Sequence, residues 1–309
     1  MMNPSYERLM LLRRLIGLGL ASCLGFVACG DSSVSKASSG TCPSTKVAVV
    51  VTVDQWGDIV SDLAGSCGVV TTIIKSSSVD PHEYEPTAGD NATFTKAQLV
   101  VINGLDYDPW ANKAIDTLSK KPMLIDGGEV VGRKEGDNPH LWYGPEYVYQ
   151  VADAVTAALK QLSPSAAAYL DERHQSWKVA MKPYDDAVAA AKLKATGKTF
   201  GATESVFDYM ASAVGLTNAT PQGYQNAASN GSDPAPGDVN DFESALRSTK
   251  MNVLIYNTQT EGAVPAQLRK VADTAKLPVV EVTETVKPGS KGFVDWQVKQ
   301  LESLTQALR

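Results

Sequence analysis

Histidine is scarce in this sequence, which has only three among 309 residues. Two of the three stand in nearly the same setting, "DPHEY" and "NPHLW", where a proline precedes the ring and an aromatic residue follows two positions later. A proline has a fixed φ, so it restricts the backbone that presents each ring. The repeated context singles out His82 and His140 as candidate functional residues.

Clusters of basic residues are lacking as well. The chain has 28 Lys and Arg against 34 Asp and Glu, a net charge of -6 and an isoelectric point near 5.2. This balance argues against a nucleic-acid partner. With 43% hydrophobic and 20% charged residues the composition is that of an ordinary globular protein, and the length favours two domains or lobes.

The longest apolar run, residues 15–28, is shorter than the roughly 20 residues that a membrane-spanning helix needs. A basic flank precedes it and a Ser/Gly-rich tail follows, which is the pattern of an export signal. The segment resembles a bacterial lipoprotein signal, in which a cysteine at the cleavage site is lipidated. We expect a signal peptide at 1–28, lipidation of Cys29 and a flexible tether at 29–45, with Cys23 in "LASC" or plain secretion as alternatives.

The two remaining cysteines, out of four, are Cys42 and Cys67. If 46–53 and 69–75 are consecutive parallel strands joined by a helix, both begin at the same edge of the sheet, so both cysteines lie near that edge. An exported chain is free to oxidise them. We therefore expect a structural disulfide, which would contribute about 3 kcal/mol by restricting the unfolded chain.

Apolar β-branched runs alternate with segments of helical periodicity along the chain, as in "KVAVVVTV" followed by "DQWGDIVSDLAG". Repeated β-α-β order predicts parallel α/β sheets. We expect an N-terminal α/β lobe at 46–162, one long linking helix at 163–196 that Pro183 kinks, and a C-terminal α/β lobe at 197–309 that repeats the pattern of the first. Within it, 226–238 reads as a surface loop ending at an N-cap aspartate.

Polar side chains follow three of the predicted strands. His82 follows "VVTTIIK", Glu204 follows "KTF" and Glu284 follows "VVEV", while His140 stands in a loop before a helix. Open α/β sheets bind ligands at the carboxyl ends of their strands. Imidazole and carboxylate groups are suitable ligands for a first-row divalent metal, so these four residues form a candidate metal site.

The segments "DPHEYEPTAGD", "NGLDYDPW", "NPHLWYGPEYV", "TESVFDYMASAVGL" and "VTETV" resemble, in order, the signature segments of the metal-binding receptors of bacterial ABC transporters. These are solute-binding lipoproteins for manganese, zinc or iron. The resemblance implies two lobes joined by a rigid helix, with the ion in the cleft between them. It also implies a monomer outside the cytoplasm that is lipid-anchored to the cell membrane, with a permease and its ATPase as partners.

The resemblance implies His82 and His140 as metal ligands from the first lobe, Glu204 from the second, and Glu284 as an acidic fourth ligand. Glu284 stands in "TET" where the family commonly has "TDS". Two carboxylates make an oxygen-rich site that favours Mn²⁺ over Zn²⁺. The His/Asp-rich loop of many zinc receptors is also missing, because no histidine lies between His82 and His140. Zn²⁺ and Fe²⁺ remain alternative cargoes.

Several other side chains have weaker motif support. We interpret His174, in the charged segment "DERHQSW", as a solvated helix residue. Tyr84 and Trp142 either shield the ion or pack against neighbouring side chains. Asn257 and Gln259 follow a strand and are candidates to line the cleft.

Three other functions are compatible with parts of the pattern. An envelope metallohydrolase would need a general base, for which Asp80, Glu83 and Glu85 are candidates, although a polar cleft rim is the simpler interpretation. A surface adhesin would use the metal only to stabilise its fold. A receptor for a chelated metal would need cationic groups in the cleft, whereas the motif segments offer mainly carboxylates.

Overall fold

The computed structural model describes residues 40–75, 79, 81–248, 250–260 and 262–309. These belong to one compact unit, Ala37–Arg309, which is distinct from Met1–Lys36. The expected signal peptide, most of the expected tether, Cys23, Cys29 and Asp80 therefore lie outside the described residues. Among the helices of the described part, none is both long and apolar enough to cross a membrane.

The first sheet consists of four parallel strands in the order β2-β1-β3-β4. Its central strands are apolar and almost fully buried, as expected for a parallel sheet that is covered on both faces. The strands are β1 (Val47–Val53), β2 (Gly68–Ile74), β3 (Leu99–Ile102) and β4 (Met123–Asp126).

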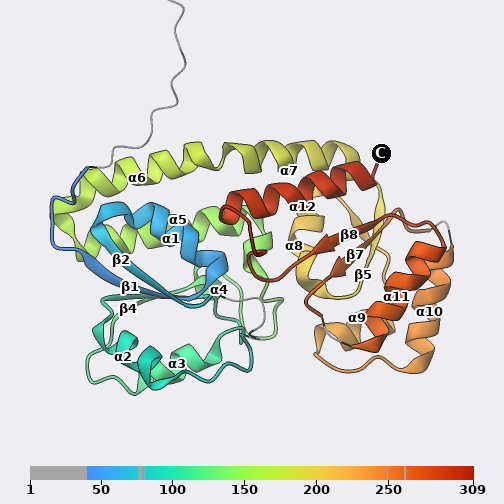
Figure 1. The fold of residues 1–309 in the computed structure, drawn as a ribbon, viewed down its shortest axis with the longest axis horizontal. Coiled ribbons are helices and arrows are strands. Elements are labelled where there is room, and N and C mark those ends of the chain that lie inside the picture. The colour runs from blue at the N-terminus through green and yellow to red at the C-terminus, as the bar shows by residue number, and fades with distance from the viewer. Residues whose placement is uncertain (1–39, 76–78, 80, 249, 261) are drawn as a thin grey trace, which may run out of the picture. The chain divides into compact units, whose positions relative to one another are not determined.

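Helices cover both faces of this sheet. In Figure 1, α1 and α5 lie on one side of the strands and α2 and α3 on the other. The predicted apolar face of α1 is buried, including Trp56 and Leu63. The helices are α1 (Asp54–Ala64), α2 (Ala88–Lys96), α3 (Pro109–Asp116), α4 (Gly127–Val130) and α5 (Pro145–Leu162).

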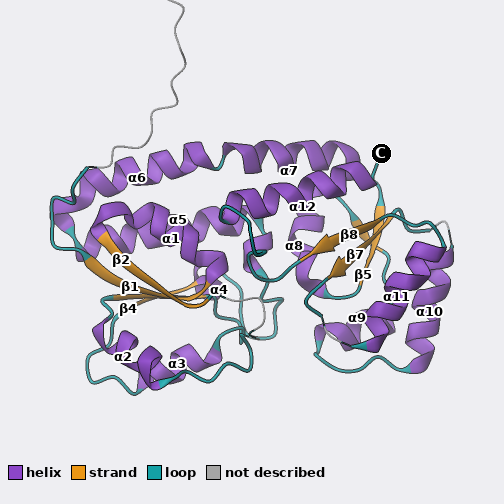
Figure 2. Ribbon diagram, viewed as in Figure 1, coloured by secondary structure: helices purple, strands orange, loops and turns teal. Residues whose placement is uncertain are grey.

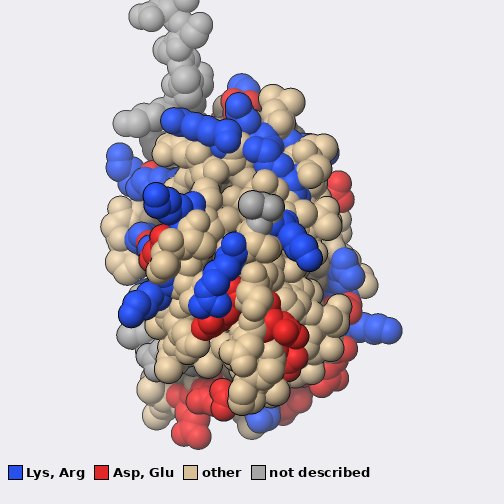
Figure 3. All heavy atoms as spheres, turned by 90° about the vertical axis from the view of Figure 1, so that its right-hand side faces the viewer, with Lys and Arg blue, Asp and Glu red and all other residues tan. Residues whose placement is uncertain are grey.

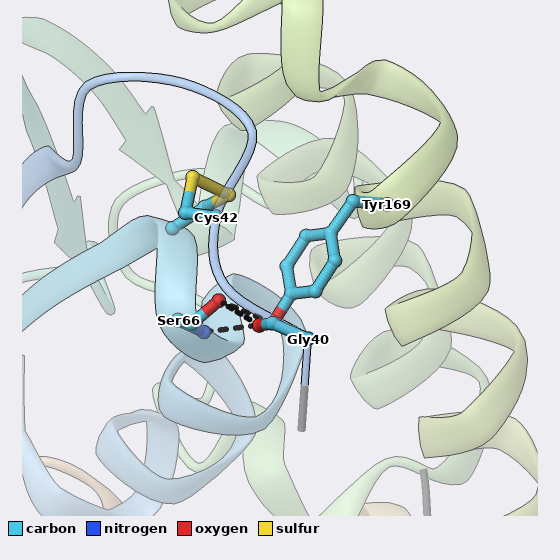
Figure 4. Close-up of a disulfide and its surroundings, with 5 residues drawn as sticks. Gly40, Cys42, Ser66 and Tyr169 are labelled. Atoms are coloured by element: carbon cyan, nitrogen blue, oxygen red, sulfur yellow. Dashed lines mark hydrogen bonds between the residues drawn. A yellow bond between two sulfur atoms is a disulfide. The ribbon is translucent and has the colours of Figure 1, made fainter. Parts of the chain in front are cut away.

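A disulfide joins Cys42 to Cys67, the two cysteines between which the sequence predicts a bond (Figure 4). Their Cα atoms are 4.9 Å apart. Next to it, the Ser66 hydroxyl donates to the Gly40 carbonyl at 2.7 Å, and the Ser66 amide donates to the Tyr169 hydroxyl at 2.8 Å. These contacts attach the chain that precedes β1 to the turn before β2, and that turn to the helix that carries Tyr169.

The linking segment is divided into two helices at the point where the sequence predicts a kink. After a short 3₁₀ turn, α6 (Ala167–Ala180) ends at Met181 and α7 (Lys182–Ala195) begins. Pro183 stands in the first turn of α7. It has no N–H to donate and its ring clashes with the carbonyl four residues earlier, which accounts for the interruption at Met181.

The second sheet repeats the topology of the first, as the sequence predicts, with parallel strands in the order β6-β5-β7-β8. Its strands are β5 (Thr199–Ala202), β6 (Thr217–Asn218), β7 (Val253–Asn257) and β8 (Val279–Val282). Its helices are α8 (Asp208–Val214), α9 (Gln222–Ser229), α10 (Pro236–Arg247) and α11 (Ala263–Thr274). Part of the expected loop at 226–238 is thus helical, and the aspartate expected as an N-cap lies inside the first turn of α10, which begins at Pro236.

The last helix, α12 (Phe293–Ala307), follows the second sheet but packs along α7 and also contacts α1 (Figure 1). Trp296 is 1% exposed, and its indole Nε1 donates to the Thr283 hydroxyl at 2.8 Å. One cluster of buried apolar residues includes members of β1, α5, α7, β5 and α12. The two sheets are therefore joined through a shared core.

Charged side chains are unevenly distributed over the surface. The face in Figure 3, which belongs to the end that carries the second sheet, shows Lys and Arg gathered in its upper half and Asp and Glu in its lower half. Lys192 and Lys194, in the last turn of α7, are among the basic residues of the second half. Folding thus gathers basic side chains that form no run in the sequence.

Candidate metal centre

The four predicted ligands all lie in loops, and loops occupy much of the space between the two groups of strands in Figure 2. His82 lies between β2 and α2, and His140 stands directly before a 3₁₀ turn, Leu141–Tyr143, that leads into α5. Glu204 and Glu284 each lie two residues beyond the end of a strand, β5 and β8. Both sheets thus present candidate ligands at the carboxyl ends of their strands.

His140 is held in one orientation by Asn138. The imidazole Nδ1 is 2.7 Å from the Asn138 Oδ1, which also accepts the His140 backbone N–H at 3.0 Å. The Asn138 Nδ2 donates to the Ser205 carbonyl at 2.7 Å, so both ends of the amide are engaged. Because an amide oxygen only accepts, Nδ1 carries the hydrogen and Nε2 is the nitrogen available to a metal.

His82 has the same arrangement with a different acceptor. Its Nδ1 is 3.0 Å from the Asp106 backbone carbonyl, so Nδ1 donates to that oxygen. The Tyr107 ring makes edge contacts with both imidazoles, with centroids 4.8 Å from His82 and 6.2 Å from His140. The fully buried Tyr107 thus lies between the two histidines.

His140 and Glu284 contact each other directly. The His140 Nε2 is 2.9 Å from the Glu284 Oε1, although 144 residues separate them in the sequence. Burial disfavours the charged form of Glu284, but the hydrogen bond and charge of His140 and the charge of His82 outweigh it, so the pKa of Glu284 is lowered. The Glu284 backbone carbonyl is also fixed, because it accepts the Gln55 amide at 3.0 Å.

Glu204 is not part of this pair. Its Oε2 accepts the Asn257 Nδ2 at 2.6 Å and also the Thr260 hydroxyl, both from the second sheet's side. Among the residues that the structure describes, no three or more His, Cys, Asp or Glu side chains lie close enough together to hold a metal ion. The structure therefore brings His140 and Glu284 together but does not gather all four predicted ligands.

Hydrogen bonds close to this pair connect the two halves of the molecule. The Tyr143 hydroxyl donates to the Thr283 carbonyl at 2.7 Å, and the Tyr209 hydroxyl donates to the Asn138 carbonyl at 2.7 Å. Together with the bond from Asn138 to the Ser205 carbonyl, they join the loops before α5 to the loops after β5 and β8. The candidate site thus lies where the two halves meet.

Asp208 is an acidic side chain near the site that the sequence did not single out. Its Oδ1 is buried and has no hydrogen-bond partner within the described part of the chain. Burial raises the pKa of Asp208 to about 6, although the charge of His140 acts in the opposite direction. The motif segment "TESVFD" contains this residue, so the signal was present, but nothing in it distinguished Asp208 from the residues beside it.

The interpretation of His174 as a solvated residue is wrong. His174 is only 7% exposed; its Nδ1 is 2.8 Å from the Thr156 hydroxyl and its Nε2 is 3.1 Å from the Asp153 carboxylate. Burial lowers its pKa. The ring joins α6 to α5, so its role is in packing these helices.

The remaining candidates have packing or supporting contacts. The Tyr84 hydroxyl donates to Asp90 at 2.7 Å, so this residue secures the start of α2. Trp142 is fully buried, and its ring centroid is 5.4 Å from that of His140. The Asn257 Nδ2 donates to Glu204, and the Gln259 side-chain Oε1 accepts the Thr285 backbone N–H at 3.0 Å beside Glu284.

Comparisons with known proteins agree with this geometry. Residues 49–307 match the model of a family described as zinc-uptake complex component A, periplasmic. One relative is the zinc-binding lipoprotein AdcA of Streptococcus pneumoniae serotype 4, which is 23% identical over 94% of this chain and 60% of AdcA. Another is the high-affinity zinc uptake system protein ZnuA of Bacillus subtilis, which is 24% identical over 94% of this chain and 96% of ZnuA. The manganese ABC transporter lipoprotein PsaA of Streptococcus pneumoniae is 23% identical over 93% of this chain and 96% of PsaA. The chain thus spans 60% of the length of AdcA but nearly all of the other two.

The solved structures show the same fold. The periplasmic zinc-binding protein TroA from Treponema pallidum superposes with a TM-score of 0.71 at 19% identity, over 85% of this chain and 99% of TroA. A cadmium-bound periplasmic metal-binding protein from Candidatus Liberibacter asiaticus gives 0.70 at 18% identity, over 85% of this chain and 100% of the other. The arrangement of two parallel sheets is therefore that of periplasmic metal-binding proteins.

Proposed function

Because the chain belongs to the family of zinc-uptake complex component A, periplasmic, we propose that it is the extracytoplasmic substrate-binding component of a metal ABC transporter. It would capture a divalent cation and deliver it to a permease that a cytoplasmic ATPase drives. The observation that carries this proposal is the direct contact between His140 and Glu284, which joins an imidazole and a carboxylate from the two halves of the molecule.

We propose that four side chains bind the transported ion: His82, His140, Glu204 and Glu284. Both imidazoles have Nδ1 bound to an oxygen acceptor, so both offer Nε2 to the ion. Glu284 would exchange its contact with His140 for the ion, and Glu204 would turn from Asn257 and Thr260 toward it. Four protein ligands leave little room for the bound water of a catalytic metal, which argues against an envelope hydrolase.

Mn²⁺ is the cargo that we propose, with Zn²⁺ as the alternative. Two carboxylates and two imidazoles form a site rich in oxygen, which manganese accepts readily. The names of the relatives include both metals: AdcA and ZnuA are named for zinc and PsaA for manganese. Zinc binds most such sites at least as tightly as manganese, so selectivity depends on geometry and availability.

The attachment of the protein is part of the same proposal. We propose that residues 1–28 are removed, that Cys29 is lipidated, and that the part of the expected 29–45 tether before the disulfide-bonded Cys42 links a monomeric receptor to the cell membrane. Relatives such as PsaA carry the word lipoprotein in their names. Mass spectrometry of the mature amino terminus would show a lipidated Cys29, whereas a lipidated Cys23 or an unmodified terminus would contradict this assignment.

The decisive experiment is elemental analysis followed by competitive Mn²⁺/Zn²⁺ titration of the purified protein, with His82→Ala and Glu204→His beside it. We expect one ion per chain, loss of that ion in His82→Ala, and a shift toward zinc in Glu204→His, because an imidazole replaces a harder oxygen ligand.

Three other outcomes would change the conclusion. Stoichiometric zinc with no manganese binding would make the protein a zinc receptor with an unusual ligand. No bound metal at all would refute the receptor function. Turnover of generic phosphoester or peptide substrates that depends on the metal would instead support the hydrolase.

A further inference from the structure

A pocket lies in the half of the molecule that holds the second sheet, and its lining includes Thr283, the residue before Glu284. Its volume is about 460 Å³, within the range of small-molecule sites. The walls come from the edge strand β8, from the loop between β8 and α12, and from one side of α12. Figure 1 shows α12 and β8 as neighbours in this region.

One buried side-chain donor in this pocket lacks an acceptor among the described residues. Gln300 is 7% exposed, and its Oε1 accepts the Tyr143 hydroxyl at 2.9 Å and the Thr283 amide at 3.1 Å. Its Nε2, by contrast, is buried without an acceptor among the described residues. An unsatisfied buried donor costs about 1–3 kcal/mol, so an acceptor supplied by a ligand would be favourable here.

The other polar groups of the pocket are also mostly donors. Lys287 and Lys299 each contribute an ammonium, and Ser290 contributes a hydroxyl. The Lys287 ammonium has no hydrogen bond or ion pair with any of the residues that the structure describes. Lys299 is already paired with Asp295 at 2.7 Å, which makes Lys287 the stronger attraction for an anion.

The acidic residue that lines the pocket, Glu281, does not oppose an anion strongly. Its Oε1 is 2.8 Å from the Arg269 Nη1, so its charge is balanced by a neighbour. The indole of Trp296 and the side chains of Val279 and Pro288 add apolar wall. Such a lining matches a ligand with an anionic head and a short apolar body.

We propose that this pocket is a second ligand site, for a small organic carboxylate. One oxygen of the ligand's carboxylate accepts a hydrogen bond from the Gln300 Nε2, and the carboxylate pairs with the Lys287 ammonium. The aliphatic body of the ligand packs against Trp296. The bound carboxylate would contact the side chain that holds the Thr283 amide, one residue before Glu284. The site itself needs no metal, so this inference stands independently of the receptor function.

Butyrate titrated into the full chain without added metal tests the proposal, with calorimetry for affinity and NMR for the Gln300 side-chain amide. We expect saturable binding of one butyrate per chain and a shift of that amide resonance. Lys287→Ala should weaken the affinity about tenfold through loss of the charge-assisted contact. Gln300→Glu, which keeps the acceptor for Tyr143 and Thr283 but replaces the donor, should weaken it at least as much.

The matched control is Lys291→Ala, an exposed lysine near the same loop that does not line the pocket. We expect it to change the affinity by less than about twofold, because screened surface charges contribute little. Equal weakening by Lys287→Ala and Lys291→Ala would overturn the proposal in favour of diffuse attraction. No saturation up to about 20 mM butyrate, or saturable binding of inorganic phosphate but not of butyrate, would overturn it too.

Discussion

At the scale of single residues, Asn138 determines which nitrogen His140 presents. Asn138→Leu removes the acceptor for Nδ1 and the donor to Ser205. We expect metal affinity to fall about 10–100-fold, the usual effect of losing a group that orients a metal-binding histidine. A competitive metal titration measures the loss.

The informative control for this prediction is Asn138→Asp, which keeps an oxygen acceptor for Nδ1 but loses the donor to Ser205. It should restore most of the affinity if orientation of the ring is the cause. Equal losses in the two variants would show that the bond to Ser205 is what the site needs.

Asp108 should make the fold more stable as the pH falls toward 5. Its carboxylate is fully buried and accepts the Thr52 hydroxyl and the amides of Asn103 and Gly104. Burial raises the pKa of Asp108 from 3.8 to about 6, and its hydrogen bonds only partly oppose this. The folded state therefore binds a proton that the unfolded state releases, and between pH 7 and pH 5 this group alone adds stability as the pH falls.

Chemical unfolding of wild type and Asp108→Asn at pH 7 and pH 5 measures this effect. The variant should be less stable at both pH values, by about 1–3 kcal/mol, because an amide cannot accept all three bonds. The gain on acidification should be smaller in the variant than in wild type by about 1 kcal/mol. An identical change with pH in both proteins would contradict the raised pKa.

The residues of the site differed in how far their sequence revealed them. The shared Pro-His context indicated His82 and His140, and the structure shows both with Nδ1 bound to an acceptor. His174 was misjudged because its partner Thr156 lies on another helix, and a charged segment carries no sign of that burial. The composition of a segment does not show which of its side chains tertiary packing will bury.

At the scale of elements, α12 connects the second sheet to α7 and supports the loop that carries Glu284. Trp296→Ala should destabilise the protein by about 3–5 kcal/mol, because it removes a buried indole and its bond to Thr283. Metal affinity should also fall, because Thr283 precedes Glu284. Thermal unfolding and metal titration measure the two effects.

Leu193→Ala is the comparison for this prediction. Leu193 belongs to α7 and is 86% exposed, so its truncation should change stability by less than about 0.5 kcal/mol. A similar loss in both variants would mean that the effect of Trp296→Ala does not come from buried contacts.

The order of the elements was predictable, but their ends were less so. Buried β-branched runs such as that of β1 predicted strands, and the apolar spacing of α1 predicted its buried face. The linking segment, predicted as one kinked helix, consists of two helices, because Pro183 has no N–H to donate and interrupts the helical hydrogen bonds. The composition of 226–238 predicted a loop, whereas the structure continues α9 to Ser229 within that segment.

At the scale of the whole molecule, the disulfide and the candidate metal site lie at opposite ends of the first sheet. Cys42 and Cys67 precede β1 and β2, while the loop with His82 follows β2. Cys42→Ser with Cys67→Ser should lower the free energy of unfolding by about 3–4 kcal/mol. Metal affinity should stay within about twofold of wild type, because the disulfide contacts none of the proposed ligands.

Thermal unfolding in the presence and absence of a reductant measures the first effect, and metal titration of the same samples measures the second. The reductant should lower the melting temperature of the wild type and leave that of the double variant unchanged. A large loss of metal affinity in the variant would show that the two ends of the sheet are coupled.

Contacts between the two halves of the chain affect how a partner can recognise the metal-loaded protein. These contacts run from Tyr143 to Thr283, from Asn138 to Ser205 and from His140 to Glu284. The first two involve none of the proposed ligands and can persist when an ion is bound, so we expect loading to change side-chain orientations more than the outline of the protein. We expect the loaded and empty proteins to have nearly the same radius of gyration in solution scattering. A membrane partner that must discriminate between the loaded and the empty protein would then sense local differences in rigidity and charge around the candidate site, and not a change of overall shape.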